Sequence, residues 1–217
     1  MPFLRGQNPV LLAVWAALLV TVIVAMALAR WELAVVAGAT LGLSIAPVAL
    51  ASRLSVNVPV AFLLGTTLFI VGSILAGEAL SFYERVWWWD LALHGMSAVG
   101  LGLFGFLFVF MLFEGDRYAA PPWAIAFLSF CFAVTIGAVW EVFEFGMDRG
   151  FGFNMQKSGL DDTMGDLIVN GCGAALGAVS GFFYLKGRNR RLFAPLIREF
   201  VERNRRLYQR AKDRIRR

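Results

Sequence analysis

Charged residues are scarce in this sequence. Only 16% of its 217 residues are Asp, Glu, Lys or Arg, whereas 59% are hydrophobic and the mean hydropathy is +0.69. A soluble globular domain has about 25% charged residues, and a disordered chain is poor in apolar ones. Both classes are therefore excluded, and the composition is that of an integral membrane protein.

Cysteine and histidine are also nearly absent. Cys131 and Cys172 both lie inside apolar runs, so they indicate neither a disulfide scaffold nor a compartment. His94 is the single histidine. The sequence has no HExxH, CxxC, Gly-x-Ser-x-Gly or phosphate-binding loop motif. Serine, cysteine and nucleotide chemistry therefore find no support, and we expect neither a nucleotide nor haem.

Long apolar runs account for most of the chain. A helix that crosses about 30 Å of hydrocarbon needs roughly 20 apolar residues. Six runs of that length are present, at about 9–29, 32–51, 58–77, 91–113, 121–146 and 166–185. We therefore expect an all-α polytopic membrane protein, with a six-helix transmembrane domain over residues 1–185.

The basic residues predict the orientation of these spans. Thirteen of the twenty Lys and Arg lie in residues 186–217. With both termini in the cytoplasm, sixteen bases fall on the inner side and four outside, namely Arg30, Arg85, Arg149 and Lys157. Bases in short loops favour the cytoplasmic side. The sequence therefore predicts cytoplasmic termini, with loops 78–90 and 147–165 facing outward.

The tail over residues 186–217 predicts a basic amphipathic helix. From Pro195 onward, apolar residues recur every three or four positions among Arg and Lys. Such a helix is typical of binding to anionic lipid at the cytoplasmic surface; docking onto a larger membrane complex is the alternative, and we expect no nucleic acid. The candidate binding residues are Arg198, Arg203, Arg206, Arg210 and Arg214.

Small residues mark the positions where helices are expected to approach closely. Gly38 and Gly42 have this spacing in the second span, and Gly173, Gly177 and Gly181 have it in the sixth. Further glycines thin the fourth span, at Gly95, Gly100, Gly102 and Gly105. We expect the last three spans to form a compact group with the sixth in the middle of the bundle.

Acidic residues in the last three spans are the strongest functional signal, because charge inside a bilayer is costly. Asp90 and His94 open the fourth span. Glu141 and Glu144 close the fifth, and Asp162, Asp166 and Asn170 run into the sixth. Each set has a spacing of three or four and so occupies one helical face. Since neighbouring spans are antiparallel, all three sets should meet at the outer end of the bundle.

Carboxylates brought together in this way take up protons or bind a cation. Oxygen ligands with one imidazole suit a divalent metal ion. The candidate metal ligands are Asp90, His94, Glu141, Glu144 and Asp166. His94, Glu141 and Glu144 are also the candidate catalytic residues, and Asp162 and Asn170 the supporting polar network.

Each of these residues also has a structural interpretation. Asp161 or Asp162, and likewise Asp90, would serve as a helix N-cap. Glu141 and Glu144 would form ion pairs with Arg85, Arg149 or Lys157, and His94 would donate to Asp90 or Glu141. What favours a functional site is that all of these residues are expected at one depth.

The spacing of these residues resembles a known group of bacterial membrane proteins. Asp90-xxx-His94, Glu141-xx-Glu144 and Asp162-Thr163-xx-Asp166-xxx-Asn170 together resemble the YjdF-like family and, more distantly, the VanZ-like family, over roughly residues 84–181. The resemblance implies a bacterial inner-membrane protein but no reaction. The VanZ-like motif commonly has Gln at the position of Glu144, and the basic tail belongs to neither pattern.

Three functions are compatible with these features. The first is an envelope protein that binds a cation and acts on a lipid or lipid-linked group at the outer leaflet. The second is a non-catalytic accessory or assembly subunit docked through the basic tail. The third, a proton or cation carrier, is the least supported, because the inner halves of the spans offer few polar residues beyond Ser44, Thr66, Thr67, Thr135 and Ser180.

Overall fold

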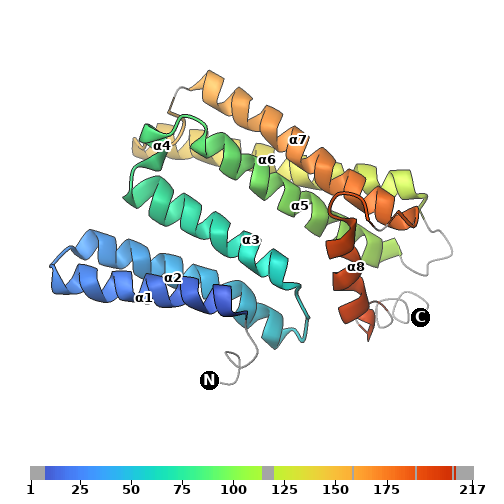
Figure 1. Ribbon diagram of the computed structural model, residues 1–217. Helices are drawn as coiled ribbons and strands as arrows, with labels where there is room; N and C mark the ends of the chain where they lie inside the picture. Colours follow the sequence, from blue (N-terminus) through green and yellow to red (C-terminus); the bar gives the residue numbers. More distant parts are fainter. Residues whose placement is uncertain (1–7, 114–119, 158, 189, 207, 209–217) are drawn as a thin grey trace. The chain divides into compact units, whose positions relative to one another are not determined.

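The computed structural model describes residues 8–113, 120–157, 159–188, 190–206 and 208, and within these ranges it contains helices and no strand. The six long helices are α1 (Pro9–Ala27), α2 (Trp31–Arg53), α3 (Val60–Ile70) continued by the π-helix η2 (Val71–Ala79), α5 (Trp89–Phe113), α6 (Pro122–Phe151) and α7 (Leu160–Leu185) (Figure 1). Each is long and apolar enough to cross a membrane. The expected all-α polytopic architecture is confirmed.

The largest difference from the expected boundaries lies between α6 and α7. Helix α6 continues to Phe151 and α7 already begins at Leu160. The N-cap of α7 is Gly159 with φ +67°, a conformation that glycine adopts without steric cost. Asp161 and Asp162 therefore lie in the first turn of α7, and the expectation that one of them is its N-cap is wrong. Asp90 likewise lies in the first turn of α5.

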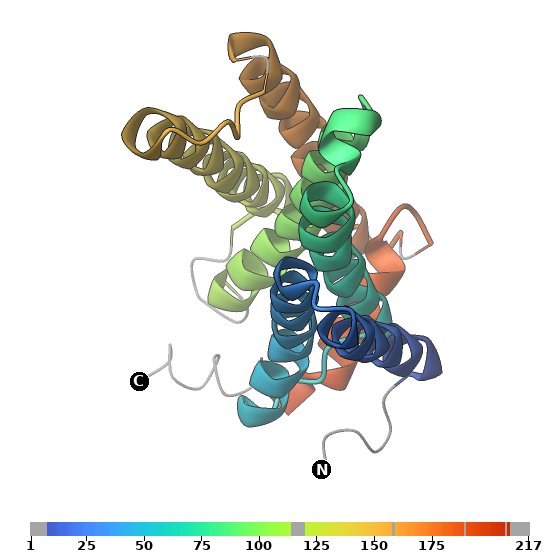
Figure 2. The same cartoon turned by 90° about the vertical axis from the view of Figure 1, so that its left-hand side faces the viewer.

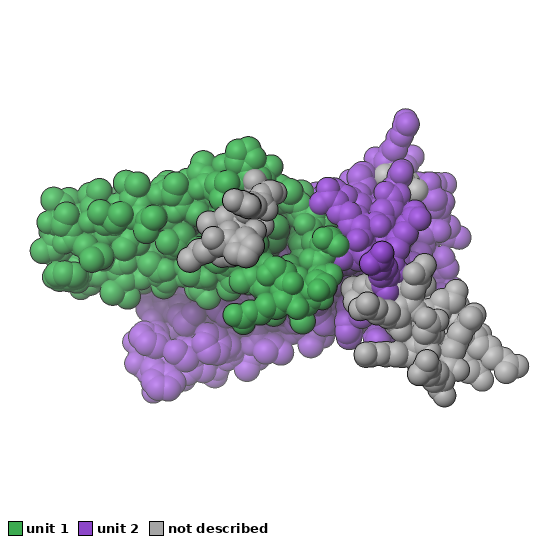
Figure 3. All heavy atoms as spheres, turned by 90° about the horizontal axis from the view of Figure 1, so that it is seen from below, with its two compact units in different colours: residues 1–89 green, residues 90–217 purple. Residues whose placement is uncertain are grey.

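The chain divides into two compact units, Met1–Trp89 and Asp90–Arg217 (Figure 3). In the first unit, α1 and α2 form a hairpin that α3 also contacts (Figure 2). Its core consists of Leu11, Trp15 and Val48. Gly38 and Gly42 do not mark a close approach as expected, because no heavy atom lies within 4 Å of a Cβ built at either position.

The π-helix η2 ends the third span. The wider turn of a π-helix alters the backbone hydrogen bonding of the segment. The indole Nε1 of Trp89 donates to the carbonyl oxygen of Gly72 at 3.0 Å, and the short helix α4 (Phe82–Arg85) places the Phe82 ring edge-on to Trp89 at 4.9 Å between centroids. Side chains beyond η2 therefore anchor this part of the first unit.

In the second unit, α5 packs against both α6 and α7. A Cβ on Gly173 would lie 2.7 Å from the Gly95 oxygen, and one on Gly177 would lie 2.8 Å from the Gly102 Cα. The residue numbers increase in the same direction on both helices, from Gly95 and Gly173 to Gly102 and Gly177, so α5 and α7 are parallel and in backbone contact. A Cβ on Gly105 would lie 2.7 Å from the Phe132 ring of α6. The expected close packing of these three spans is therefore present.

Helix α8 (Ala194–Arg203) lies against α7 (Figure 1). Ala194 and Ile197 on its apolar side are fully buried, and Ser180 of α7 accepts a hydrogen bond from the Phe193 backbone N–H at 3.3 Å. This part of the amphipathic helix thus turns its apolar side to protein rather than to lipid. The division at residue 186 stays a prediction.

We expect Gly177→Ala to destabilise the protein. The added methyl group overlaps the backbone of Gly102, so the two helices must separate, at a cost of roughly 1–3 kcal/mol. Thermal unfolding in detergent should show a Tm lowered by roughly 3–10 °C. Gly171→Ala is the matched control on the same helix, because its Cβ would meet nothing within 4 Å. Equal Tm values for the two variants would contradict the contact.

Candidate metal centre

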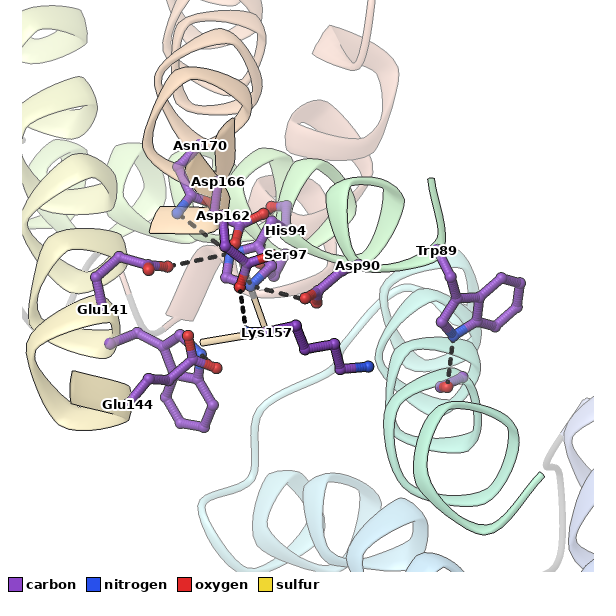
Figure 4. A network of polar contacts seen from close by, with 12 residues as sticks. Trp89, Asp90, His94, Ser97, Glu141, Glu144, Lys157, Asp162, Asp166 and Asn170 are labelled. Atoms are coloured by element: carbon purple, nitrogen blue, oxygen red, sulfur yellow. Dashed lines mark hydrogen bonds and ion pairs between the residues drawn. The ribbon is translucent and has the colours of Figure 1, made fainter. Parts of the chain in front are cut away.

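Three helices of the second unit each contribute polar side chains to one cluster (Figure 4). Helix α5 supplies Asp90 and, one turn later, His94; α6 supplies Glu141 and Glu144; and α7 supplies Asp166 and Asn170. The helices come close at this level because Gly137 of α6 faces Asn170, with only 2.8 Å between a built Cβ and the amide nitrogen. Residues separated by up to eighty positions are thereby neighbours.

His94 lies at the centre of the cluster. Its Nε2 is 3.6 Å from Asp90 Oδ1 and 3.9 Å from Asp166 Oδ2. Its Nδ1 is 3.7 Å from Glu141 Oε1 and 3.4 Å from the Asn170 amide nitrogen. Both ring nitrogens therefore face carboxylate oxygen, from different helices on the two sides.

Most of the cluster is buried inside the protein. Only 1% of the Asp166 surface and 4% of the Glu141 surface is exposed, and His94, Glu144 and Asn170 are also buried. The side chain of Asp90 is the most accessible of the cluster, at 26%. Asp90 therefore marks the least buried side of the cluster.

Several buried oxygens lack the hydrogen bonds that their burial requires. Both carboxylate oxygens of Glu141 and Oδ2 of Asp166 have no hydrogen-bond partner within the described part of the chain. Leaving a buried acceptor unsatisfied costs about 1–3 kcal/mol, and more if the group is charged. Unlike these two, Glu144 accepts a hydrogen bond from the indole of Trp140 at 3.0 Å.

The spacing of the cluster fits coordination better than hydrogen bonding. Nitrogen–oxygen hydrogen bonds are typically about 2.7–3.2 Å long, whereas the separations around His94 are 3.6–3.9 Å. Two ligands on one tetrahedral ion with bonds of about 2.0–2.2 Å lie roughly 3.3–3.6 Å apart. The cluster contains two triads whose candidate ligand atoms lie somewhat farther apart than this, within 4.8 Å of one another: Asp90, His94 and Asp166, and His94, Glu141 and Glu144.

Arginine does not neutralise these carboxylates. In the part of the chain that the structure describes, no arginine forms an ion pair with Glu141 or Glu144. Arg149 instead lies over the ring of Phe145, 5.6 Å from its centroid. The expected ion pair of the two glutamates with Arg149 is therefore not formed, and the pair with Arg85, which lies in the first unit, stays a prediction.

The segment between α6 and α7 is tied down beside the cluster. Asp148 near the end of α6 accepts hydrogen bonds from the backbone N–H groups of Met155 at 2.7 Å and Gln156 at 2.9 Å. The Gln156 amide donates to Thr163 at 2.6 Å, and the Lys157 N–H donates to Asp162 at 3.2 Å. Asp162 thus holds this connection rather than completing either triad.

Trp140, Asp148 and Thr163 did not emerge from the sequence as site residues. Trp140 precedes Glu144 by four positions, the spacing that places two side chains on one helical face, so the pair was recognisable in principle. The hydrogen bonds of Asp148 depend on how residues 152–159 turn, and no short motif encodes that path.

The basic residues of the tail are distributed unevenly. Arg198 and Arg203 of α8 form ion pairs with Glu202 and Glu199 at 2.8 and 2.7 Å. The hydrogen bond to Glu202 raises the pKa of Arg198 above its ordinary value. Arg206 is exposed, and Arg210 and Arg214 lie outside the described residues. The acids of α8 thus partly neutralise its own basic face.

Six apolar helices, with a buried polar cluster among α5, α6 and α7, define a polytopic all-α membrane protein. The chain belongs to the family described as Predicted membrane protein (DUF2238), whose model matches residues 10–187. That description contains neither the YjdF-like nor the VanZ-like name, so this finer resemblance stays a prediction.

One curated relative is an uncharacterised protein of Thermotoga maritima, 35% identical over 99 residues. The match covers 44% of this chain and 50% of the relative, so the chain spans about half the length of that protein. No solved structure matches the chain. The comparisons therefore establish the family and leave the roles of the site residues as predictions.

We expect Asp148→Ala to expose the segment between α6 and α7 to protease. The substitution removes both bonds to the Met155 and Gln156 N–H groups. Loss of about 1.5 kcal/mol of local stability raises the open population roughly tenfold. Tryptic cleavage after Lys157, followed by mass spectrometry, should accelerate accordingly. Asp161→Ala, at an exposed acid four residues after Lys157, should leave the rate unchanged; equal rates for both variants would contradict the role of Asp148.

Proposed function

We propose that this protein binds a divalent cation at the cluster around His94 and uses it to act on a lipid or lipid-linked group of the bacterial envelope. One observation carries the proposal: three carboxylates from three helices surround the two His94 nitrogens at 3.6–3.9 Å without hydrogen-bonding to them. A membrane protein pays heavily for such buried acids, and a cation offsets that cost.

The donor atoms favour particular ions. One imidazole nitrogen with several carboxylate oxygens suits Zn²⁺ or Mn²⁺, whereas Mg²⁺ and Ca²⁺ prefer oxygen ligands alone. The buried oxygens of Glu141 and Asp166 that lack hydrogen-bond partners are the atoms that an ion would satisfy. The residues present therefore fit a divalent metal.

The protein groups divide into holding and orienting roles. Asp90, His94 and Asp166 hold the ion, and Asn170 beside Nδ1 fixes the plane of the imidazole. Glu141 and Glu144 form the second candidate ligand group with His94, and either carboxylate, when it is not bound to an ion, can accept or give a proton. A bound divalent ion would supply Lewis acidity and lower the pKa of coordinated water.

A substrate from the bilayer is favoured by the position of Trp140. Its indole donates to Glu144, yet 46% of its surface is exposed on α6. The neighbouring Phe143 is likewise 46% exposed. Apolar exposed side chains on a membrane-spanning helix suit contact with acyl chains. The cluster therefore lies one side chain away from an apolar surface through which a lipid headgroup would approach.

The proposal predicts that the purified chain carries a divalent metal. Elemental analysis without chelators should find Zn or Mn in wild type and little in His94→Ala, because that residue belongs to both triads. Ser97→Ala is the matched control: Ser97 lies on the same helix and its hydroxyl donates to the His94 carbonyl at 2.9 Å. No metal in either wild type or Ser97→Ala would sink the proposal and favour an accessory subunit with a structural polar network.

The same proposal places the chain in the inner membrane with both termini in the cytoplasm. The basic residues after α7 support this orientation, and three of them lie over aromatic rings. Lys186 lies over Phe182 at 5.8 Å, and Arg188 and Arg191 lie over Phe183 at 6.0 and 5.6 Å. Cations held at the end of a membrane-spanning helix suit anionic lipid headgroups of the inner leaflet.

We expect anionic lipid to stabilise the protein through this basic region. Added phosphatidylglycerol should raise the Tm in detergent more than phosphatidylcholine does. The combined variant Arg198→Gln, Arg203→Gln and Arg206→Gln should lose part of that difference, because each base near the surface contributes about 1 kcal/mol. Arg53→Gln, a basic residue of the first unit, is the control. An unchanged lipid effect in the triple variant would argue against α8 as the lipid-binding element.

A further inference from the structure

We propose that the cluster holds two divalent cations, one on each side of the His94 ring, rather than one. This inference rests on the proposed cation-binding function and specifies the number of ions and their ligands. The first position is formed by Asp90, Asp166 and Nε2 of His94, and the second by Glu141, Glu144 and Nδ1.

The geometry of an imidazole prevents a single ion from using all of these groups. The lone pairs of Nδ1 and Nε2 lie in the ring plane and diverge, so an ion bound to one nitrogen points away from the other. Asp90 and Asp166 face Nε2, whereas Glu141 faces Nδ1. The two triads share only His94, and one ion therefore serves one triad.

Orphaned oxygens are present on both sides of the ring. Asp166 Oδ2 lacks a hydrogen-bond partner on the Nε2 side, and both oxygens of Glu141 lack one on the Nδ1 side. An ion at the first position satisfies Asp166 and leaves the buried Glu141 carboxylate with hydrogen-bond donors alone, among them the Thr163 hydroxyl. Only ions at both positions supply a partner on each side of His94.

The charge of the cluster also favours two ions over one. The two triads contain four carboxylates and one imidazole. One divalent ion beside the four carboxylates and a neutral imidazole leaves a net charge of −2 in a membrane-spanning bundle, whereas two ions beside the four carboxylates and an imidazolate leave −1. Coordination of both ring nitrogens also requires the Asn170 amide, whose nitrogen lies 3.4 Å from Nδ1, to turn away from that lone pair, and the imidazole to release its remaining N–H proton, which passes to water. Bound ions stabilise the resulting imidazolate as they stabilise other deprotonated ligands.

The two positions differ in their access and in the helices they join. The first ties α5 to α7 and includes Asp90, whose side chain is 26% exposed. The second ties α5 to α6 through Glu141, whose side chain is 5% exposed. We therefore expect an ion at the first position to exchange with a chelator before an ion at the second.

The number of ions tests the inference. The full chain in detergent is stripped with chelator, reloaded with Zn²⁺, freed of excess metal by gel filtration and measured for zinc per chain. Wild type should retain two ions, and Asp166→Asn and Glu144→Gln one each. Asp161→Asn, an exposed acid of α7 outside both triads, should retain two. One ion in wild type, with Glu144→Gln unaffected, overturns this inference and leaves the cation site in place; no ion overturns both.

A titration of wild type alone avoids variants that fold poorly. Two Cu²⁺ ions bridged by one imidazolate couple magnetically, so the EPR signal should grow up to one equivalent and fall as the second binds. A signal that doubles at the second equivalent, with both ions retained, would overturn the shared role of His94. Growth to one equivalent followed only by free copper would limit the cluster to a single ion.

Discussion

The backbone contact between α5 and α7 is the constraint on which the site depends. Glycines on both helices, such as Gly102 and Gly177, allow the chains to approach to a distance that no other residue permits. Because the two helices are parallel, the same contact sets the level at which His94 meets Asp166. The glycines thus set how α5 and α7 align along their axes, and this alignment determines which carboxylate lies beside the imidazole.

A second constraint is the low polarity around the cluster. Buried carboxylates without hydrogen-bond partners are rare in proteins because the unfolded chain would hydrate them. Here Glu141 and Asp166 occur together around a single imidazole and away from any arginine of the described chain. The cost of this arrangement is understandable if the acids interact with a ligand, and it is hard to explain by stability alone.

The sequence allowed the spans and the three sets of polar residues to be predicted, because apolar length and helical spacing are local properties. Glu141 and Glu144, for example, share a face by spacing alone. The start of α7 at Leu160 was not predictable in the same way, because the helix begins at a glycine with positive φ rather than at an aspartate cap. Gly38 and Gly42 have the spacing of a packing motif, yet a Cβ built at either position meets nothing within 4 Å, so that motif is not sufficient.

The sequence could not predict which carboxylate oxygens face which ring nitrogen of His94. The rotation of α6 about its axis decides whether Glu141 or Glu144 is nearer to Nδ1, and that rotation follows from contacts such as Gly137 against Asn170 and Gly105 against Phe132. The surroundings of the basic tail could not be predicted from the sequence either. Its amphipathic pattern predicts a helix, but whether lipid or protein covers Ala194 and Ile197 depends on the surface of α7.

The order of the helices along the chain has a consequence for biogenesis. Asp90, His94, Glu141 and Glu144 all precede α7, which supplies Asp166, Asn170 and the glycines that seat against α5. A chain emerging from the ribosome therefore places its acidic α5 and α6 at the translocon before their partner exists. Helix α7 is synthesised after α5 and α6 and closes the cluster, and until it arrives those acids need water, protons or the insertion machinery as partners.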